Sequence, residues 1–271
     1  MNEASVLYEM RETVAVVTLN EGDRMNPLSE SLQAGLIDAI ERVRADKSVR
    51  AMLLTANGRG FCVGADLQDF ARRSDELPAG DSLGRYVGRM MEETGNRLIL
   101  ALRSLPVPLV CAINGAAAGG GVGFALAGDM VIAARSAYFY LPFVPALGIV
   151  PDMGSSWTLP RSIGQARALG LTLTGDKLGA EKAAAWGLIW ACVEDEKLYD
   201  EALKLARQLA LLPAHAVLEA RALFAVSERN GLEQQLGAER ARQQELIDGA
   251  SFSEGVKAFI ERRKPVFKAR G

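Results

Sequence analysis

The sequence predicts an α/β fold whose ligand site lies at the carboxyl ends of parallel strands. In the first half of the chain, a buried strand, a glycine-bearing loop and a helix follow one another twice, first from residue 51 and again from residue 109. A helical segment also separates the β-rich run at 14–19 from the strand at 51–55. Strand, helix and strand at this spacing predict a right-handed parallel crossover. Such strands end at one edge of the sheet, where α/β proteins bind ligands.

The N-terminal segments form the first crossover. Leu7–Met10 and Val14–Leu19 are β-rich runs separated by two polar residues, a pattern typical of a hairpin. Ser29 suits the N-cap of a helix, because its hydroxyl accepts a hydrogen bond from a free N–H group of the first turn. Ala51–Thr55 predicts the next buried strand. The helix between them has an apolar face at helical spacing, made of Leu32, Leu36, Ile37, Ile40 and Val43.

The glycine-rich stretch Gly115–Gly123 is the centre of the prediction. The apolar run Leu109–Ile113 leads into it, and the helix-like run Phe124–Ala127 leads out. Glycine lets the backbone approach a ligand closely, and the first N–H groups of a helix have no intrahelical acceptors, so this turn can hold an oxyanion or a phosphate. Tight packing of a strand against a helix would use the same glycines, so the motif alone leaves both interpretations open.

The remaining segments extend the α/β pattern and then become helical. The polar segment Asp69–Asp81 has little periodicity, which is typical of a flap or lid. We expect a long helix at 82–103, strands at 109–113 and 130–134, an irregular stretch at 138–151, helices at 161–173, 180–186 and 197–211, and a short strand at 190–193. We therefore divide the chain into a core with the ligand site at 1–200 and a C-terminal helical oligomerisation region at 201–271.

Composition narrows the class of protein. The chain has 271 residues, 49% of them hydrophobic, which allows one substantial core. The net charge of −2 gives no electrostatic footprint for nucleic acid. No apolar run is long enough to span a bilayer, and the first residues lack the pattern of a signal peptide, so we expect a cytoplasmic protein without a membrane partner. Three cysteines without ligand spacing, Cys62, Cys111 and Cys192, predict reduced core residues and no metal site.

Familiar catalytic motifs are missing. His215 is the only histidine, and no Gly-x-Ser-x-Gly elbow occurs, so a Ser-His-Asp hydrolase is disfavoured. The dinucleotide fingerprint fails because Phe124 stands where its last glycine is required, and no Walker motif is present. Nucleotide phosphates are therefore not the expected ligand.

Four motifs in the same order give the chain a resemblance to the crotonase superfamily, also called the enoyl-CoA hydratase/isomerase family. The resemblance covers nearly the whole length, and together the motifs are highly specific. It implies a crotonase (ClpP-like) spiral of ββα units with a helical C-terminal part, assembled as a homotrimer or homohexamer. The motifs are Phe61–Leu67, Ala112–Gly115 with Ala118–Gly121, Gly148–Asp152, and Leu173–Gly175 with Ala183, Gly187 and Leu188.

The resemblance also implies a site for an acyl-CoA thioester, with no cofactor besides the coenzyme A of the substrate. The N–H groups of Ala65 and Gly120 would form an oxyanion hole, since proton removal beside a thioester builds enolate charge on its oxygen. The backbone of the loop formed by Val63, Gly64, Ala65, Asp66 and Leu67 would receive the CoA adenine. Arg24 matches a basic position near the CoA phosphates, and it fits an ordinary surface cation equally well.

The chain departs from the hydratases of this family. These enzymes use two glutamates, whose positions here fall on Gly123 and on or near Val144, so hydration is disfavoured. Asp152 is the remaining carboxylate, in a Val150–Gly154 segment similar to the 2-(1,2-epoxy-1,2-dihydrophenyl)acetyl-CoA isomerase and enoyl-CoA delta-isomerase branches. One base suffices for isomerisation, because it can remove a proton and return it elsewhere. As an alternative, Asp152 caps a helix that starts at Met153.

We therefore expect an acyl-CoA isomerase in which Ala65 and Gly120 stabilise an enolate and Asp152 moves the proton. The alternatives are an enoyl-CoA hydratase and a non-catalytic family member that binds CoA esters or RNA. The low net charge argues against RNA.

Overall fold

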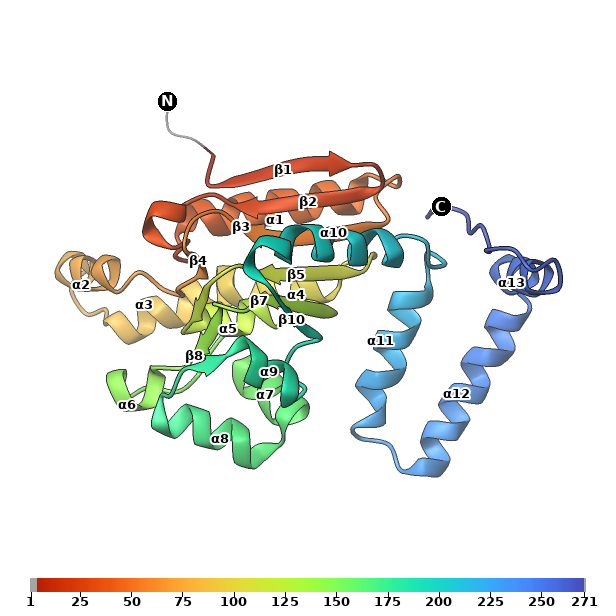
Figure 1. Cartoon of the computed structure of the whole chain (residues 1–271). Helices are drawn as coiled ribbons and strands as arrows, with labels where there is room; N and C mark the ends of the chain where they lie inside the picture. Colours follow the sequence, from red (N-terminus) through yellow and green to blue (C-terminus); the bar gives the residue numbers. More distant parts are fainter. Residues whose placement is uncertain (1–3, 271) are drawn as a thin grey trace.

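Two β-sheets form the body of the protein in the computed structural model (Figure 1). The structure describes residues 4–270, apart from the side chains of Gln68, Phe70, Ala71, Ser74 and Asp75. The larger sheet has the strand order β1-β2-β3-β5-β7-β10. The first two strands are an antiparallel hairpin, and the others run parallel to β2. These strands are Val6–Arg11, Val14–Leu19, Ala51–Ala56, Leu109–Ile113, Met130–Ala134 and Ala191–Val193.

The smaller sheet is built from short strands, three of which (β4, β6 and β8) directly follow strands of the larger sheet. Its order is β4-β6-β8-β9, with β4, β6 and β8 parallel and β9 antiparallel to β8. These strands are Gly60–Cys62, Ala116–Ala118, Tyr138–Tyr140 and Leu178–Gly179. A helix follows each of the first three: α2 (Leu67–Glu76), α5 (Gly120–Ala125) and α6 (Phe143–Leu147). The chain thus repeats a ββα unit three times, which confirms the predicted spiral.

Helices pack on the larger sheet. Helix α1 (Glu30–Ala45) contacts β1 and β2, and its first turn is capped as predicted, since the N–H of Leu32 donates to the Oγ of Ser29 at 3.2 Å. Helix α10 (Leu198–Leu209), close to the predicted bounds of 197–211, contacts β3, β5 and β7, and its residues Leu198 and Ala202 are buried. Short 3₁₀ turns lie at Gly22–Arg24 and Asp195–Lys197.

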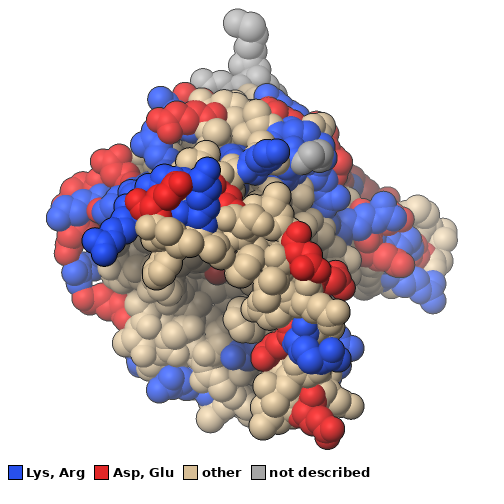
Figure 2. Space-filling model, turned by 90° about the vertical axis from the view of Figure 1, so that its right-hand side faces the viewer, with Lys and Arg blue, Asp and Glu red and all other residues tan. Residues whose placement is uncertain are grey.

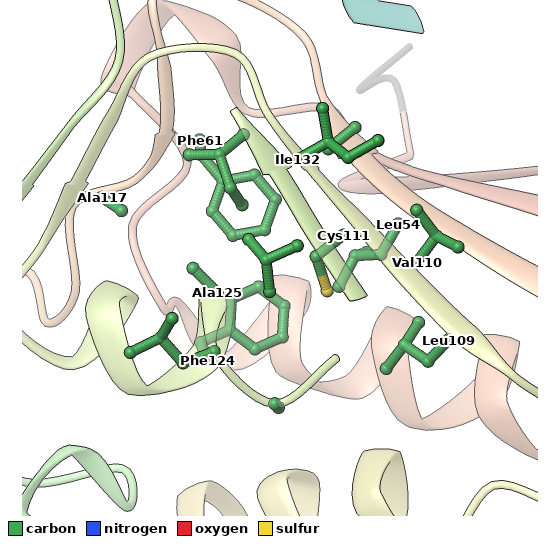
Figure 3. Close-up of a cluster of buried hydrophobic side chains, with 14 of the residues drawn as sticks. Leu54, Phe61, Leu109, Val110, Cys111, Ala117, Phe124, Ala125 and Ile132 are labelled. Atoms are coloured by element: carbon green, nitrogen blue, oxygen red, sulfur yellow. The ribbon is translucent and has the colours of Figure 1, made fainter. Parts of the chain in front are cut away.

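The hydrophobic core joins the two sheets beneath the glycine-rich stretch. The ring of Phe61 in β4 stacks on the ring of Phe124 in α5, with centroids 5.6 Å apart (Figure 3). Cys62 and Cys111 are buried free thiols, as predicted, and burial raises the pKa of each to about 12. Cys192 is also a free thiol, but it is half-buried and packs against the edge of the core rather than within it.

The predicted long helix exists with one irregularity. It runs through α3 (Leu83–Met90), a π-helical turn at Met91–Gly95 and α4 (Asn96–Arg103). Ser82 caps its start, where the N–H of Arg85 donates to the Ser82 Oγ at 3.2 Å. A π turn carries one extra residue per turn, and such turns are frequent at functional sites.

Several local predictions were wrong. The segment 69–81 is not an irregular flap along its length, because α2 continues to Glu76; its first turn is held by Asp66, whose Oδ1 accepts the N–H of Asp69 at 3.3 Å. The glycine-rich stretch contains the strand β6, and its helix begins at Gly120 rather than Phe124. The stretch 138–151 contains β8 and α6, so it is not irregular throughout.

The helix predicted from residue 161 is two helices. They are α7 (Ser155–Ile163) and α8 (Gln165–Thr174), divided at Gly164. Gly164 has a φ of 78°, a left-handed value that interrupts a right-handed helix and that glycine adopts without steric cost. Helix α9 (Ala180–Ala185) follows close to the predicted bounds.

The C-terminal helices extend away from the sheets (Figure 1). They are α11 (Ala216–Ser227), α12 (Leu232–Ile247) and α13 (Ala250–Ile260), and no residue of α11 or α12 is buried. Figure 2 views the molecule from this side and shows basic and acidic side chains interspersed around a hollow lined mostly by other residues. A helical C-terminal part is thus confirmed, whereas its role in oligomerisation stays a prediction. Within residues 4–270, no helix is long and apolar enough to cross a membrane.

Candidate active site

The two backbone segments predicted to form the oxyanion hole lie against each other. Gly64 has a φ of 78°, and a β-carbon built on it would lie 2.9 Å from the nitrogen of Gly120 and 2.9 Å from the carbonyl oxygen of Ala118. Only glycine allows this approach, because it combines a left-handed backbone with no side chain. Ala65 follows directly, so the loop that carries its N–H group is packed on the start of α5.

The position of Gly120 at the start of α5 leaves its N–H group without an intrahelical partner. Gly119 precedes the helix with φ 53° and ψ −131°, a conformation that glycine tolerates, and its own N–H donates to the carbonyl oxygen of Tyr140 at 2.9 Å. The first N–H groups of any α-helix lack acceptors within the helix and carry the positive end of its dipole. This arrangement suits a developing negative charge.

Asp152 lies beside Gly120. A β-carbon built on Gly120 would lie 3.1 Å from the Oδ1 of Asp152. This oxygen is buried and has no hydrogen-bond partner among the residues that the structure describes. Burial disfavours the charged carboxylate and raises the pKa of Asp152 to about 6, partly offset by a hydrogen bond from its own N–H group. A carboxyl with this pKa can act as a base near neutral pH.

The capping alternative for Asp152 is wrong. Helix α7 begins at Ser155, its N-cap residue is Gly154, and no side chain caps it. Asp152 contributes only its backbone carbonyl, which accepts the N–H of Ser155 at 2.9 Å. The carboxylate is therefore not engaged by the helix, and it lies toward Gly120.

The two positions that match the hydratase glutamates hold no acid. A β-carbon built on Gly123 would lie 2.2 Å from the carbonyl oxygen of Met153, so no side chain fits there. Val144 lies half-buried in α6. Phe143, the first residue of α6, instead packs beside the glycine-rich stretch, where its Cζ would lie 3.9 Å from a β-carbon built on Gly119.

Arg24 and Asp66 form an ion pair at the edge of the loop. The guanidinium of Arg24 contacts the carboxylate of Asp66 and lies 3.6 Å from that of Glu21. The Arg24 side chain is 55% exposed, so it can also meet an incoming anion. Asp66 holds both Arg24 and the first turn of α2, and Leu67, the first residue of that helix, is exposed.

Three residues near Gly120 were missed by sequence reasoning. The Cδ1 of Leu28 would lie 3.4 Å from a β-carbon on Gly120, and the N–H of Leu28 donates to the Gly64 carbonyl at 2.8 Å. The Met153 side chain also packs against Gly120 and reaches Gly95, where its Sδ would lie 3.1 Å from a built β-carbon. A glycine inside a predicted helix was the one available signal, because such a glycine often marks close packing.

Trp157 of α7 lines a cavity that neither Asp152 nor Gly120 borders. Its ring lies between Arg103 and Arg161, at 4.8 and 4.1 Å from the two guanidinium carbons. This cavity of about 810 Å³ lies between the body and α11. Across residues 4–270 and their described side chains, no group of three or more His, Cys, Asp or Glu residues is arranged to hold a metal ion.

Comparison with known proteins places this chain in a family. The family model for enoyl-CoA hydratase/isomerase matches residues 9–270. The chain therefore belongs to the enoyl-CoA hydratase/isomerase family, and the predicted crotonase fold is confirmed. A crystal structure of an enoyl-CoA hydratase from Polaromonas sp. JS666 superposes with a TM-score of 0.89 at 28% identity, covering 97% of this chain and 99% of that one.

Curated relatives carry the names of two reactions. The chain is 42% identical to the 1,2-epoxyphenylacetyl-CoA isomerase of Escherichia coli (strain K12), over 98% of each chain. It is 40% identical to a probable enoyl-CoA hydratase of Rhodobacter capsulatus, over the full length of both. The family is thus settled, while the choice between isomerisation and hydration depends on the site.

Proposed function

We propose that the protein is an acyl-CoA isomerase that moves a double bond of an enoyl-CoA thioester through an enolate. The observation that carries the proposal is the buried Asp152 carboxyl beside Gly120, in a site where Gly123 leaves no room for a second acid. Hydration needs one group to activate water and another to protonate the α-carbon, whereas isomerisation needs a single base.

In the proposed mechanism the substrate is a 3-enoyl-CoA with its thioester oxygen at the N–H groups of Ala65 and Gly120. The Asp152 carboxylate removes a proton from C2, and the electron pair of that bond moves toward the thioester oxygen to form a dienolate. The electron pair then moves back from the thioester oxygen into the carbon chain, and C4 takes the proton from the Asp152 carboxyl. The double bond now lies between C2 and C3. The carboxylate is restored, and neither water nor a redox cofactor is consumed.

The two N–H groups have to supply only a moderate stabilisation of the transition state. Removing one oxyanion-hole donor in a characterised enzyme costs about 2.7 to 4 kcal/mol, so two preorganised donors supply a substantial part of the barrier lowering. A proton shuttle by a well-placed carboxyl adds roughly 10²- to 10⁴-fold in rate. Its pKa of about 6 keeps Asp152 in the basic form at neutral pH and leaves its conjugate acid strong enough to return the proton.

A second substrate class has support from one relative. The 1,2-epoxyphenylacetyl-CoA isomerase that is 42% identical acts, by its name, on a ring epoxide attached to a CoA thioester. The same base and oxyanion hole would remove a proton from the carbon beside the thioester carbonyl of such an ester, which gives the corresponding enolate, and the Asp152 carboxyl would return that proton to the rearranged product. We propose this as the alternative substrate for the same site.

We also propose that the protein assembles as a homotrimer or homohexamer and is located in the cytoplasm.

The test is a paired assay of the wild type and Asp152→Asn with a 3-enoyl-CoA and a 2-enoyl-CoA. Absorbance follows the position of the double bond, and mass spectrometry follows any gain of water. We expect migration without a change of mass, lost by at least about 10²-fold in the variant, which still binds the thioester. Hydration of the 2-enoyl-CoA that persists in Asp152→Asn would contradict the proposal.

A further inference from the structure

Met153 has a backbone conformation that is unusual for its residue type. Its φ is 49°, in the left-handed region, where a β-carbon makes the backbone costly by about 1 to 3 kcal/mol. The residue is 7% exposed and belongs to the hydrophobic core. A methionine adopts this unfavourable backbone conformation only when the surrounding structure fixes it. Met153 directly follows Asp152, so the same constraint acts next to the proposed base.

The side chain of Met153 runs between two glycines. Its Cγ would lie 3.0 Å from a β-carbon on Gly120, and its Sδ would lie 3.1 Å from a β-carbon on Gly95. Both contacts are tight, so the thioether fits only because neither partner has a side chain. Methionine is unbranched and adapts to such irregular gaps.

Gly95 brings the long helix to this point through its π turn. It is the last residue of the turn Met91–Gly95, and it is buried. The glycines of the preceding helix α3, Gly84 and Gly88, have no atom within 4 Å of a built β-carbon. Contact with Met153 is therefore specific to the π turn and is not a general property of the helix.

The acyl group would pass this side chain. If the thioester oxygen of a substrate lies at the N–H of Gly120, the carbon next to the thioester carbonyl lies within reach of the Asp152 carboxyl. The Met153 side chain packs on the same glycine, so it lies beside this carbon. We propose that Met153, held by Gly95 of the π turn, is a specificity-determining residue that excludes acyl groups branched at the carbon next to the thioester carbonyl. This inference rests on the proposed function only in placing the thioester at Gly120.

Two substitutions are expected to act in opposite directions. Met153→Ala removes the thioether while keeping a β-carbon at the same φ, which opens space beside the α-carbon. Gly95→Ala adds a methyl group 3.1 Å from the Sδ, and the flexible end of the methionine must shift toward Gly120. Gly88→Ala is the matched control, because it places the same methyl group on the same helix in open space.

The probes are butanoyl-CoA and 2-methylpropanoyl-CoA, which have the same composition and differ in branching at the α-carbon. Neither has a double bond to move, so isothermal titration calorimetry measures binding without turnover. We expect Met153→Ala to shift the ratio of dissociation constants toward the branched ester by about 10-fold, the usual effect of one methyl group in a tight pocket. Gly95→Ala shifts it toward the straight chain, and Gly88→Ala leaves it at the wild-type value.

The outcomes separate this inference from the proposed function. Wild-type protein that binds both esters without isomerising any enoyl-CoA would refute the isomerase, and the ratios would still decide the role of Met153. Three results would overturn the inference. The ratio of dissociation constants could stay within twofold of the wild type in both Met153→Ala and Gly95→Ala, it could shift in the same direction in both, or the wild type could bind neither ester. If Met153→Ala does not fold, Gly95→Ala alone decides it.

Discussion

Gly123 of α5 packs directly on the backbone carbonyl of Met153. A β-carbon on Gly123 would lie 2.2 Å from that carbonyl oxygen and 2.9 Å from the Met153 Cβ, distances that no side chain tolerates. This contact fixes the segment that carries Asp152 against the helix that begins at Gly120. The same contact removes the space in which a hydratase-type glutamate would stand, so the absent acid and the placement of Asp152 have one structural cause.

Gly123→Glu is therefore expected to disrupt the protein rather than to restore hydration. The same holds for Gly123→Ala, because the conflict begins at the β-carbon and involves backbone, and we expect a loss of roughly 3 kcal/mol or more in the free energy of unfolding. Urea unfolding followed by circular dichroism measures it. The control is Gly170→Ala in α8, which has open space and gains helix propensity. A folded Gly123→Glu enzyme with hydratase activity would contradict this account.

Gly64→Ala is expected to damage catalysis by separating the two N–H groups of the proposed oxyanion hole. The added methyl group would lie 2.9 Å from the Gly120 nitrogen, and loss of one such donor costs about 10²- to 10³-fold in kcat. Gly80→Ala is the matched control, since Gly80 also has a positive φ, of 86°, and no neighbouring atom within 4 Å. Steady-state kinetics of both variants separates the strain of a left-handed alanine from displacement of the site. Equal kcat values in the two would refute the prediction.

Asp152→Asn is expected to be more stable than the wild type at pH 7 but not at pH 4. The pKa of Asp152 is raised from 3.8 to about 6 in the folded state, so between these values the native protein binds more protons than the unfolded chain. Stability of the wild type then falls as pH rises through this window, by on the order of 1 to 3 kcal/mol from this one group. Asparagine does not titrate. Denaturant unfolding of both proteins at pH 4 and pH 7 isolates the effect, and a pH-independent difference would exclude it.

Arg24→Ala is expected to weaken binding of CoA esters without changing kcat. An exposed arginine that contacts a phosphate contributes modestly, so we expect a rise in KM of less than about 10-fold, diminished at high salt. Because Arg24 also pairs with Asp66, the control is Asp66→Asn, which breaks the ion pair while leaving the guanidinium in place. If both variants raise KM equally, Arg24 acts by holding the loop rather than by binding phosphate.

The sequence by itself determined the local elements and the chemistry available to them. Periodicity and capping predicted the hairpin, the helix after Ser29 and the buried strands, because these depend on residues close together in the chain. Resemblance in ordered motifs predicted the spiral, and the absence of acids at Gly123 and Val144 left Asp152 as the remaining carboxylate. The segment after Asp66 was misjudged, since a capped polar helix at the surface lacks the apolar periodicity on which the prediction relied.

Tertiary structure decided the rest, because it depends on contacts between residues far apart in the sequence. The approach of Gly64 to Gly120, the position of Asp152 beside that glycine and the burial that raises its pKa all arise from packing of separate ββα units. The left-handed Met153 and the π turn at Gly95 have no clear local signature either. Each depends on the other. The π turn brings Gly95, which has no side chain, to the Met153 thioether, and the thioether fills the gap between Gly95 and Gly120.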